Sequence, residues 1–234
     1  MSSGARLRQA RRRALNEKGR FDWRDPLWPA QVTILATILL GLALPERLTI
    51  GASWMLPTVE GVLFVALVAT TPRRPLREVP GRRQLRISLV ALVSAANVVA
   101  LFLLAEILVD GGRTDGKPLL IGGADLWLTA VLLFAVWFWE LDRGGPVRRL
   151  LTDDRNPDFV FPQMEEGDFF PGDDDWRPGI DDYLYLSLSN AASFTPPEST
   201  VPLTTTARLL LAIQTIASLA TITVVLSYAI NNLN

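Results

Sequence analysis

The chain of 234 residues contains no cysteine and no histidine. The lack of cysteine excludes disulfides and thiol chemistry, and the lack of histidine removes the usual general base at neutral pH. The three consecutive acids at 173–175 lack the spaced ligands of a calcium loop. We therefore expect no enzyme, no metal and no cofactor, and a net charge of −1 gives no reason to expect a nucleic-acid partner.

Charged residues are scarce over long stretches of the chain. Only 20% of the residues are charged, and they gather at 1–25, 73–86 and 142–182, with long apolar runs between them. A helix needs roughly 20 apolar residues to cross a bilayer. The pattern predicts an all-α fold, a polytopic transmembrane helix bundle whose partner is the lipid bilayer.

Five apolar segments are candidate spans, and the second of them is short for a crossing. They lie at 28–44, 57–71, 85–109, 124–142 and 207–230. The resulting organisation is a basic cytoplasmic tail at 1–26, a four-helix transmembrane region at 27–142, a solvated acidic Pro/Gly loop at 143–180, and a C-terminal hairpin at 181–234.

Arginine in the short polar segments predicts the orientation. Basic residues crowd the N-terminal tail, the 72–87 loop and the segment after the fourth span, which lie on one side if all five segments cross. The positive-inside rule then places the N-terminus in the cytoplasm and the C-terminus outside. Because arginine greatly outnumbers lysine, we expect a bacterial protein, located in the inner membrane.

The C-terminal hairpin begins with a half-length helix. Residues 181–194 are amphipathic and too short to cross a bilayer, and Pro196 and Pro197 then stop the helix. The last span starts after Pro202. A half-helix, a turn and a full helix together predict a re-entrant loop. This loop enters from the cytoplasmic side, unless one of the five candidate spans, in the first place the second, does not cross.

This hairpin resembles the pore domain of the two-helix potassium channel superfamily. DYLYLSLSNAASF, PPES and VPLTTTARLL are similar to its pore helix, filter region and inner-helix start. The matching positions are Asp182, Leu184, Tyr185, Ser187, Glu198, Pro202, Thr204 and Arg208. The resemblance implies a homo-oligomer around the C-terminal hairpin and passage of monovalent ions.

The whole chain also resembles a bacterial family of membrane proteins of unknown function. The shared motifs are a DFP-like element, a D-[FY]-L-Y step, an arginine-led last helix and a final A-[IV]-N. The first and last motifs correspond to Asp158, Phe159, Phe161, Pro162 and 229–231. This resemblance implies the same number of spans and no particular activity.

The filter region departs from the potassium channel pattern. A potassium filter uses glycines so that successive carbonyls point at the pore axis, whereas proline fixes φ and restricts the preceding residue to extended conformations. We therefore expect no potassium-type selectivity, and a pore of other chemistry stays open. The pore-loop candidates are Asn190, Ser193, Phe194, Thr195, Pro196, Pro197 and Glu198.

The last span carries polar residues on one helical face. Gln214, Ser218, Thr221 and Tyr228, with Val225 between them, recur at steps of three and four residues. This face either lines a water-filled path or hydrogen-bonds to neighbouring helices. The pattern leaves both readings open.

Among the acids near the spans, Glu106 is the candidate for proton or cation binding. It lies one turn from the end of the third span, and ionisable groups at this depth are functional candidates. We read Glu60 and Asp125 as ordinary first-turn acids, and Glu140 and Asp142 as membrane-edge acids.

Two hypotheses follow for function. The first is a channel-like membrane protein without potassium-type selectivity. The alternative is a non-conducting scaffold or sensor, whose basic tail binds anionic lipid or a partner protein.

Overall fold

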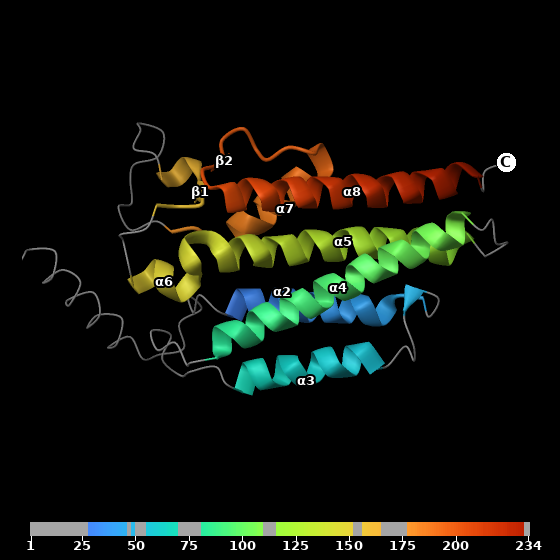
Figure 1. Cartoon of the computed structure of the whole chain (residues 1–234), viewed down its shortest axis with the longest axis horizontal. Helices are drawn as coiled ribbons and strands as arrows, with labels where there is room; N and C mark the ends of the chain where they lie inside the picture. The colour runs from blue at the N-terminus through green and yellow to red at the C-terminus, as the bar shows by residue number, and fades with distance from the viewer. Residues whose placement is uncertain are drawn as a thin grey trace, which may run out of the picture.

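The protein folds as an all-α helical bundle. A computed structural model describes residues 28–45, 48–49, 55–69, 81–109, 116–151, 156–164 and 177–231. Five long or medium helices run along one axis (Figure 1). They are α2 (Trp28–Ala43), α3 (Met55–Ala69), α4 (Arg82–Val109), α5 (Gly116–Leu141) and α8 (Thr205–Asn231).

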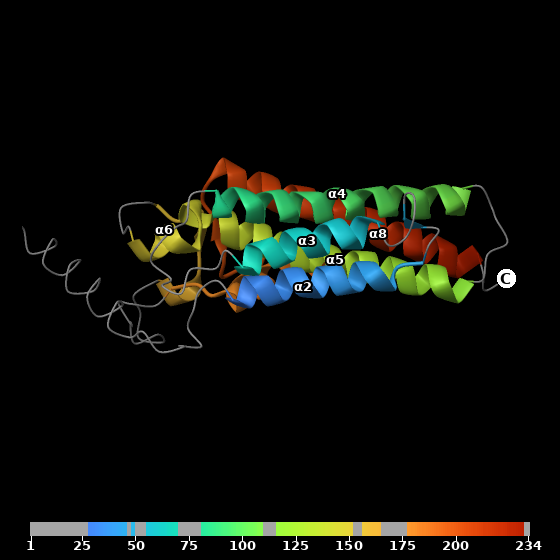
Figure 2. The ribbon, with the colours of Figure 1, turned by 90° about the horizontal axis from the view of Figure 1, so that it is seen from below.

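Successive helices from α2 to α5 alternate in direction, and α8 runs opposite to α5. Figure 1 shows α2 and α3 below α5, and Figure 2, seen from below, shows them in front of it. The half-length helix α7 (Ile180–Ser193) packs against α5 and α8. It confirms the half-helix expected at 181–194.

Three helices are long and apolar enough to cross a membrane. They are the segments Arg83–Ile107, Pro118–Gly144 and Thr205–Ile230, with 25, 27 and 26 residues. At about 1.5 Å per residue, each exceeds the roughly 30 Å of a bilayer's hydrocarbon core. The helices Trp28–Ala43 and Leu56–Ala69 are also apolar but shorter, so the count of five spans stays a prediction.

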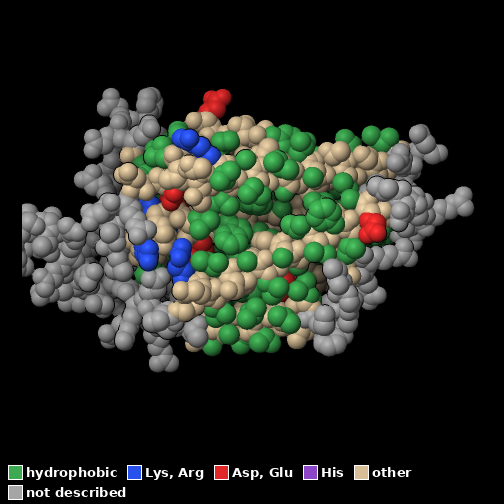
Figure 3. All heavy atoms as spheres, viewed as in Figure 1, with side chains coloured by type: hydrophobic (Ala, Val, Ile, Leu, Met, Phe, Trp, Pro, Cys, Tyr) green, Lys and Arg blue, Asp and Glu red, His purple; other side chains and the backbone are tan. Residues whose placement is uncertain are grey.

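The outer surface of the bundle is apolar. Val65, Phe102 and Ile216 are 65%, 71% and 68% exposed, and hydrophobic side chains dominate the face drawn in Figure 3. Water does not favour such a continuous apolar surface, whereas lipid tails cover it without cost. Together with the three long apolar helices, this surface indicates a membrane protein.

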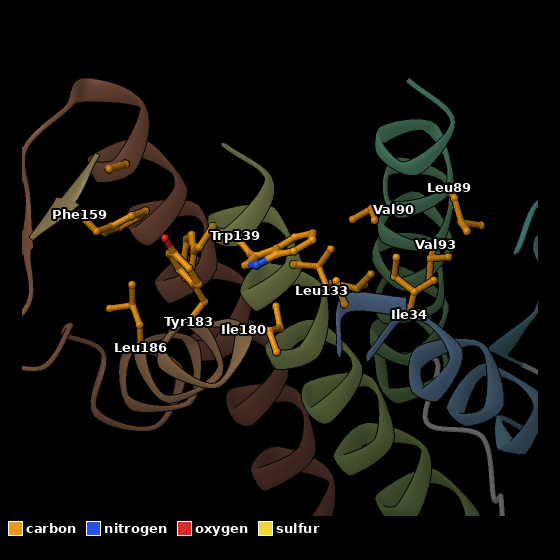
Figure 4. Close-up of a cluster of buried hydrophobic side chains, with 14 of the residues drawn as sticks. Ile34, Leu89, Val90, Val93, Leu133, Trp139, Phe159, Ile180, Tyr183 and Leu186 are labelled. Carbon is orange, nitrogen blue, oxygen red and sulfur yellow. The ribbon is translucent and has the colours of Figure 1, made fainter. Parts of the chain in front are cut away.

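The largest hydrophobic cluster contains side chains from α2, α3, α4, α5, α7 and α8. Figure 4 shows Ile34 on α2 beside Val93 on α4, with Trp139 on α5 and Tyr183 on α7 continuing the cluster. Trp139 and Tyr183 are 2% and 0% exposed. Because α5 contributes to the cluster and packs against α2, α4, α7 and α8, it is the central helix of the fold.

Two segments differ from the sequence expectation. Helix α5 begins at Gly116 rather than at 124, because Pro118 lies in the first turn, where a missing N–H costs nothing. The insert is not wholly a solvated loop: it contains the short helix α6 (Pro146–Leu151) and the strand β1 (Phe159–Val160). Phe159 is 1% exposed. The basic tail at 1–26 and the acids at 173–175 lie outside the described residues.

Gly123 on α5 permits close approach of α8, and its replacement gives a test. A Cβ atom at Gly123 would collide with Cγ2 of Val225, whereas at Gly61 nothing lies within 4 Å. We expect Gly123→Ala to destabilise the fold by about 1–3 kcal/mol, because overpacking forces the helices apart. Gly61→Ala, the matched control, should be neutral or stabilising. Equal thermal unfolding of the two variants would contradict close α5–α8 packing.

Candidate functional site

The segment from α7 to α8 leaves and returns to the same end of the bundle. At its start, Oη of Tyr183 donates to Oδ2 of Asp142 at 2.5 Å, just after α5 ends. At its end, strand β2 (Val201–Pro202) pairs antiparallel with β1, and the Leu203 N–H donates to the Asp158 carbonyl at 2.9 Å. The half-helix and the turn after it therefore bring the chain back to the end of the bundle at which α7 begins, and re-entry into the membrane stays a prediction.

Side chains of α7 and α8 hydrogen-bond along a buried contact, which we call the hairpin seam. Asn190 Nδ2 donates to Gln214 Oε1 at 2.9 Å and to the Leu211 carbonyl at 3.1 Å. Gln214 Nε2 donates to Ser187, at 2.5 Å to Oγ and 2.9 Å to the carbonyl. Ser187 Oγ in turn donates to the Val131 carbonyl on α5 at 2.7 Å. The seam thus links all three helices.

The polar face of α8 continues this seam. Ser218 Oγ donates to the Ala191 carbonyl at 2.8 Å and lies 2.6 Å from the donor Trp127 Nε1. Thr221 Oγ1 donates within its own helix to the Ala217 carbonyl at 2.8 Å. Gln214, Ser218 and Thr221 are between 1% and 3% exposed, and Tyr228 is buried in a second hydrophobic cluster. These residues lie between helices of the same chain.

The residues of the turn lie at the surface. Ser193, Thr195 and Glu198 are exposed, and Phe194 is 42% exposed. Phe194 ends α7 in the left-handed conformation, with φ of 58°, which is strained for a bulky residue. Pro196 and Pro197 are half-buried. The structure therefore separates the pore-loop candidates: Asn190 belongs to the seam, whereas the residues from 193 to 198 form a surface turn.

Glu106 also lies at the surface. It occupies an exposed position on α4, close to the end of the helix at Val109. The structure therefore places the candidate intramembrane acid outside the packed interior of the protomer.

Sequence reasoning missed a cluster of buried charges at one end of the bundle, which we call the charged end. Arg86 on α4 forms a bidentate ion pair with Glu140 on α5, with Nη2 to Oε2 at 3.2 Å. Arg149 on α6 lies 3.7 Å from the Asp142 carboxylate and donates to the Trp139 carbonyl at 2.7 Å. Arg86 and Glu140 are 3% and 1% exposed, so these are not ordinary membrane-edge charges.

Asp158 of the DFP-like motif ties the charged end to the hairpin. Its N–H donates to Asp142 Oδ1 at 2.8 Å, and its Oδ2 accepts from the Arg143 N–H at 2.7 Å. Its Oδ1 accepts from the Thr204 hydroxyl at 2.6 Å. One carboxylate therefore binds both the segment before the hairpin and the start of α8 after it.

Tyr183 is the aromatic centre of the charged end. The guanidinium of Arg149 lies 5.3 Å from its ring centroid, and Phe159 and Phe161 meet the ring edge-to-face. Burial raises the pKa of the Tyr183 hydroxyl well above its usual range. The hydroxyl therefore stays protonated and keeps donating to Asp142.

A sequence signal for the charged end exists in retrospect. Glu140 and Asp142 are followed across Gly144 and Gly145 by an Arg-Arg pair, and Arg86 begins the neighbouring span at the same end. Opposite charges at adjacent helix ends predict pairing, although not which residues pair. Among the residues that the structure describes, no group of three or more acids is arranged to hold a metal.

Comparison with known proteins gives no match to the chain, whether with protein families, curated proteins or solved structures.

Proposed function

We propose that this membrane protein is a non-conducting scaffold that binds anionic lipid or an acidic partner through its basic N-terminal tail and the exposed arginine beside its charged end. The observation that supports this proposal most is the hairpin seam. Gln214 hydrogen-bonds to α7, and Ser218 hydrogen-bonds to both α7 and α5. The polar face of α8 therefore stabilises helix packing. In one protomer, it is not free to line a water-filled path.

Arginine supports the proposed orientation. Arg148 is exposed, and Arg83 and Arg143 are half-buried, at the end of the bundle where α4 begins and α5 ends, and Figure 3 shows basic side chains gathered at this end of the drawn face. We place this end, with the N-terminus, in the cytoplasm of a bacterial inner membrane. Each arginine near an anionic surface contributes about 1 kcal/mol to binding, so the basic tail adds further attraction.

A channel formed between copies is the second candidate. The exposed turn at Thr195 and Glu198 lies at the C-terminal end of α7, where a pore helix presents its loop to an axis. Several copies packed around the C-terminal hairpin would bring these turns together. A ring of carboxylates and hydroxyls favours cations over anions, and monovalent cations are the permeants that we propose for this candidate.

Purified protein in liposomes separates the two candidates. We expect no potassium or sodium flux above that of protein-free vesicles, under either a gradient or a voltage. We also expect co-sedimentation with phosphatidylglycerol vesicles, and weaker co-sedimentation with phosphatidylcholine vesicles. Flux that Glu198→Ala changes, and that the exposed control Glu106→Ala does not, would overturn the scaffold and establish the channel.

A further inference from the structure

Two arginines beside the charged end have no partner within the chain. In the part of the chain that the structure describes, Arg83 and Arg148 make no hydrogen bond or ion pair. The other described arginines at this end bind carboxylates, the Met164 sulfur or backbone carbonyls; they are Arg86, Arg149, Arg143, Arg177 and Arg208. Arg83 and Arg148 are therefore the two guanidinium groups that are still able to bind an outside group.

Arg83 is half-buried although its donors are not satisfied. It lies in the first turn of α4, and its Nε atom is buried and has no hydrogen-bond partner. Buried donors in native proteins are almost always satisfied, by protein groups, by water or by an ion. For a guanidinium group the best partner is an oxyanion, because its planar set of donors matches a phosphate or a carboxylate.

Gly145 brings both arginines to one corner of the bundle. A Cβ atom at Gly145 would lie 3.7 Å from Nε of Arg83 and 3.6 Å from Oε2 of Glu140. Helix α6 begins at the next residue, and Arg148 follows Gly145 by three residues, which is about one helical turn. Long arginine side chains cover this distance, so both guanidinium groups can contact one small anion. Glu140 does not neutralise them, because it is already paired with Arg86.

This corner lies at the boundary of two membrane-spanning segments. The apolar segment of α4 begins at Arg83, and that of α5 ends at Gly144. Lipid phosphates lie just outside the hydrocarbon core, and basic pockets between membrane helices bind anionic headgroups. The first N–H groups of α4 also lack carbonyl partners within the helix, and the positive end of its dipole attracts an anion.

We propose that Arg83 and Arg148 form a binding site for the phosphate group of an anionic phospholipid, at the corner between the start of α4 and the junction of α5 with α6. This inference rests on the proposed function, because it names one place at which anionic lipid binds. Arg83 is held beside Gly145 and is the fixed contact, whereas Arg148 is exposed and closes on the phosphate from α6.

Native mass spectrometry of the full-length protein in detergent, with added phosphatidylglycerol, tests the proposal by counting the lipids that each chain retains. We expect the wild type to retain phosphatidylglycerol, and Arg83→Gln and Arg148→Gln each to bind it roughly tenfold more weakly. Arg208→Gln is the matched control, because it removes an exposed arginine that already donates to the Pro202 and Leu203 carbonyls. Equal weakening in this control, or unchanged retention in both site variants, would overturn the site.

Thermal unfolding of the same samples separates loss of lipid from loss of fold. Arg148 is exposed, so Arg148→Gln keeps the test valid even if Arg83→Gln unfolds. Arg83→Lys keeps the charge and loses the planar fork, so its affinity should lie between those of the wild type and Arg83→Gln.

Two further measurements identify the source of the phosphate and keep this site distinct from the proposed function. Lipid retention should survive an excess of inorganic phosphate, and displacement by inorganic phosphate would assign the corner to the free ion instead. Co-sedimentation of the wild type with phosphatidylglycerol vesicles, together with unchanged lipid retention in both site variants, would remove this site and leave the proposed function. Retention that depends on Arg83 and Arg148, without co-sedimentation, would establish the site and remove the scaffold.

Discussion

Replacement of Asp142 by alanine is expected to destabilise the protein by about 3–5 kcal/mol, enough to remove most of the folded population. Asp142 is fully buried and accepts from the Tyr183 hydroxyl and the Asp158 N–H. Its loss also leaves Arg149, 4% exposed, without its carboxylate. A buried charge without its partner is the most costly consequence of a single substitution at the charged end.

Size-exclusion chromatography after detergent extraction, with tryptophan fluorescence during heating, measures this effect. Asp181→Ala is the matched control, because Asp181 is an exposed acid in the first turn of α7. Tyr183→Phe should have an intermediate effect of about 1 kcal/mol, since it removes one hydrogen bond and keeps the ring. If Asp142→Ala unfolds at the wild-type temperature, the charged end does not hold the hairpin.

The helices were predictable because their determinants are local. The apolar stretch before Pro45 and the two prolines after Phe194 bound α2 and α7 to within one or two residues of the sequence expectation. Helix α5 was drawn too short, because Gly122 and Gly123 resemble a loop when read alone. In the fold, a side chain at Gly122 would collide with Leu48, and one at Gly123 would collide with Val225. These glycines are therefore required by close packing and not by a turn.

The partners of polar residues were not predictable, because they depend on which helices meet. The spacing of Gln214 and Ser218 identified a face but left its neighbour open, and the structure supplies α7 and α5. Arg86 and Glu140 are 54 residues apart in sequence, and no local pattern joins them. Glu60 was read as a first-turn acid, whereas α3 begins at Met55 and Glu60 lies buried in its second turn.

These failures share a physical cause. In a bilayer the apolar surface is common to every helix, so hydrophobic patterning locates spans without specifying their neighbours. The few buried polar groups then determine which helices pack against each other, because their hydrogen bonds are satisfied in only one arrangement. The charged end and the hairpin seam are therefore expected to determine the arrangement of the bundle, while the apolar faces determine only that it enters the membrane.

The ion pair between Arg86 and Glu140 gives the sharpest test of whether buried polar groups determine the helix arrangement. Arg86→Met should lower the free energy of unfolding by about 3–5 kcal/mol, because Glu140 remains buried with no cation. Glu140→Leu should lower it by a similar amount, because Arg86 then remains buried without its carboxylate. The double variant should recover most of that loss, since two apolar side chains of similar volume replace a buried pair at little net cost. Thermal unfolding in one detergent completes the double-mutant cycle.

Arg148→Met is the matched control, because Arg148 is exposed on α6 at the same end and should change stability by less than about 0.5 kcal/mol. Strictly additive losses in the double variant would contradict the pairing, because independent sites add and a desolvated pair does not. Recovery in the double variant would instead mean that the pair selects this helix arrangement without supplying the free energy that holds it together. In that case the double variant, although stable, is expected to bind phosphatidylglycerol vesicles less well than wild type, because the arginines around the pair would no longer be held in one place.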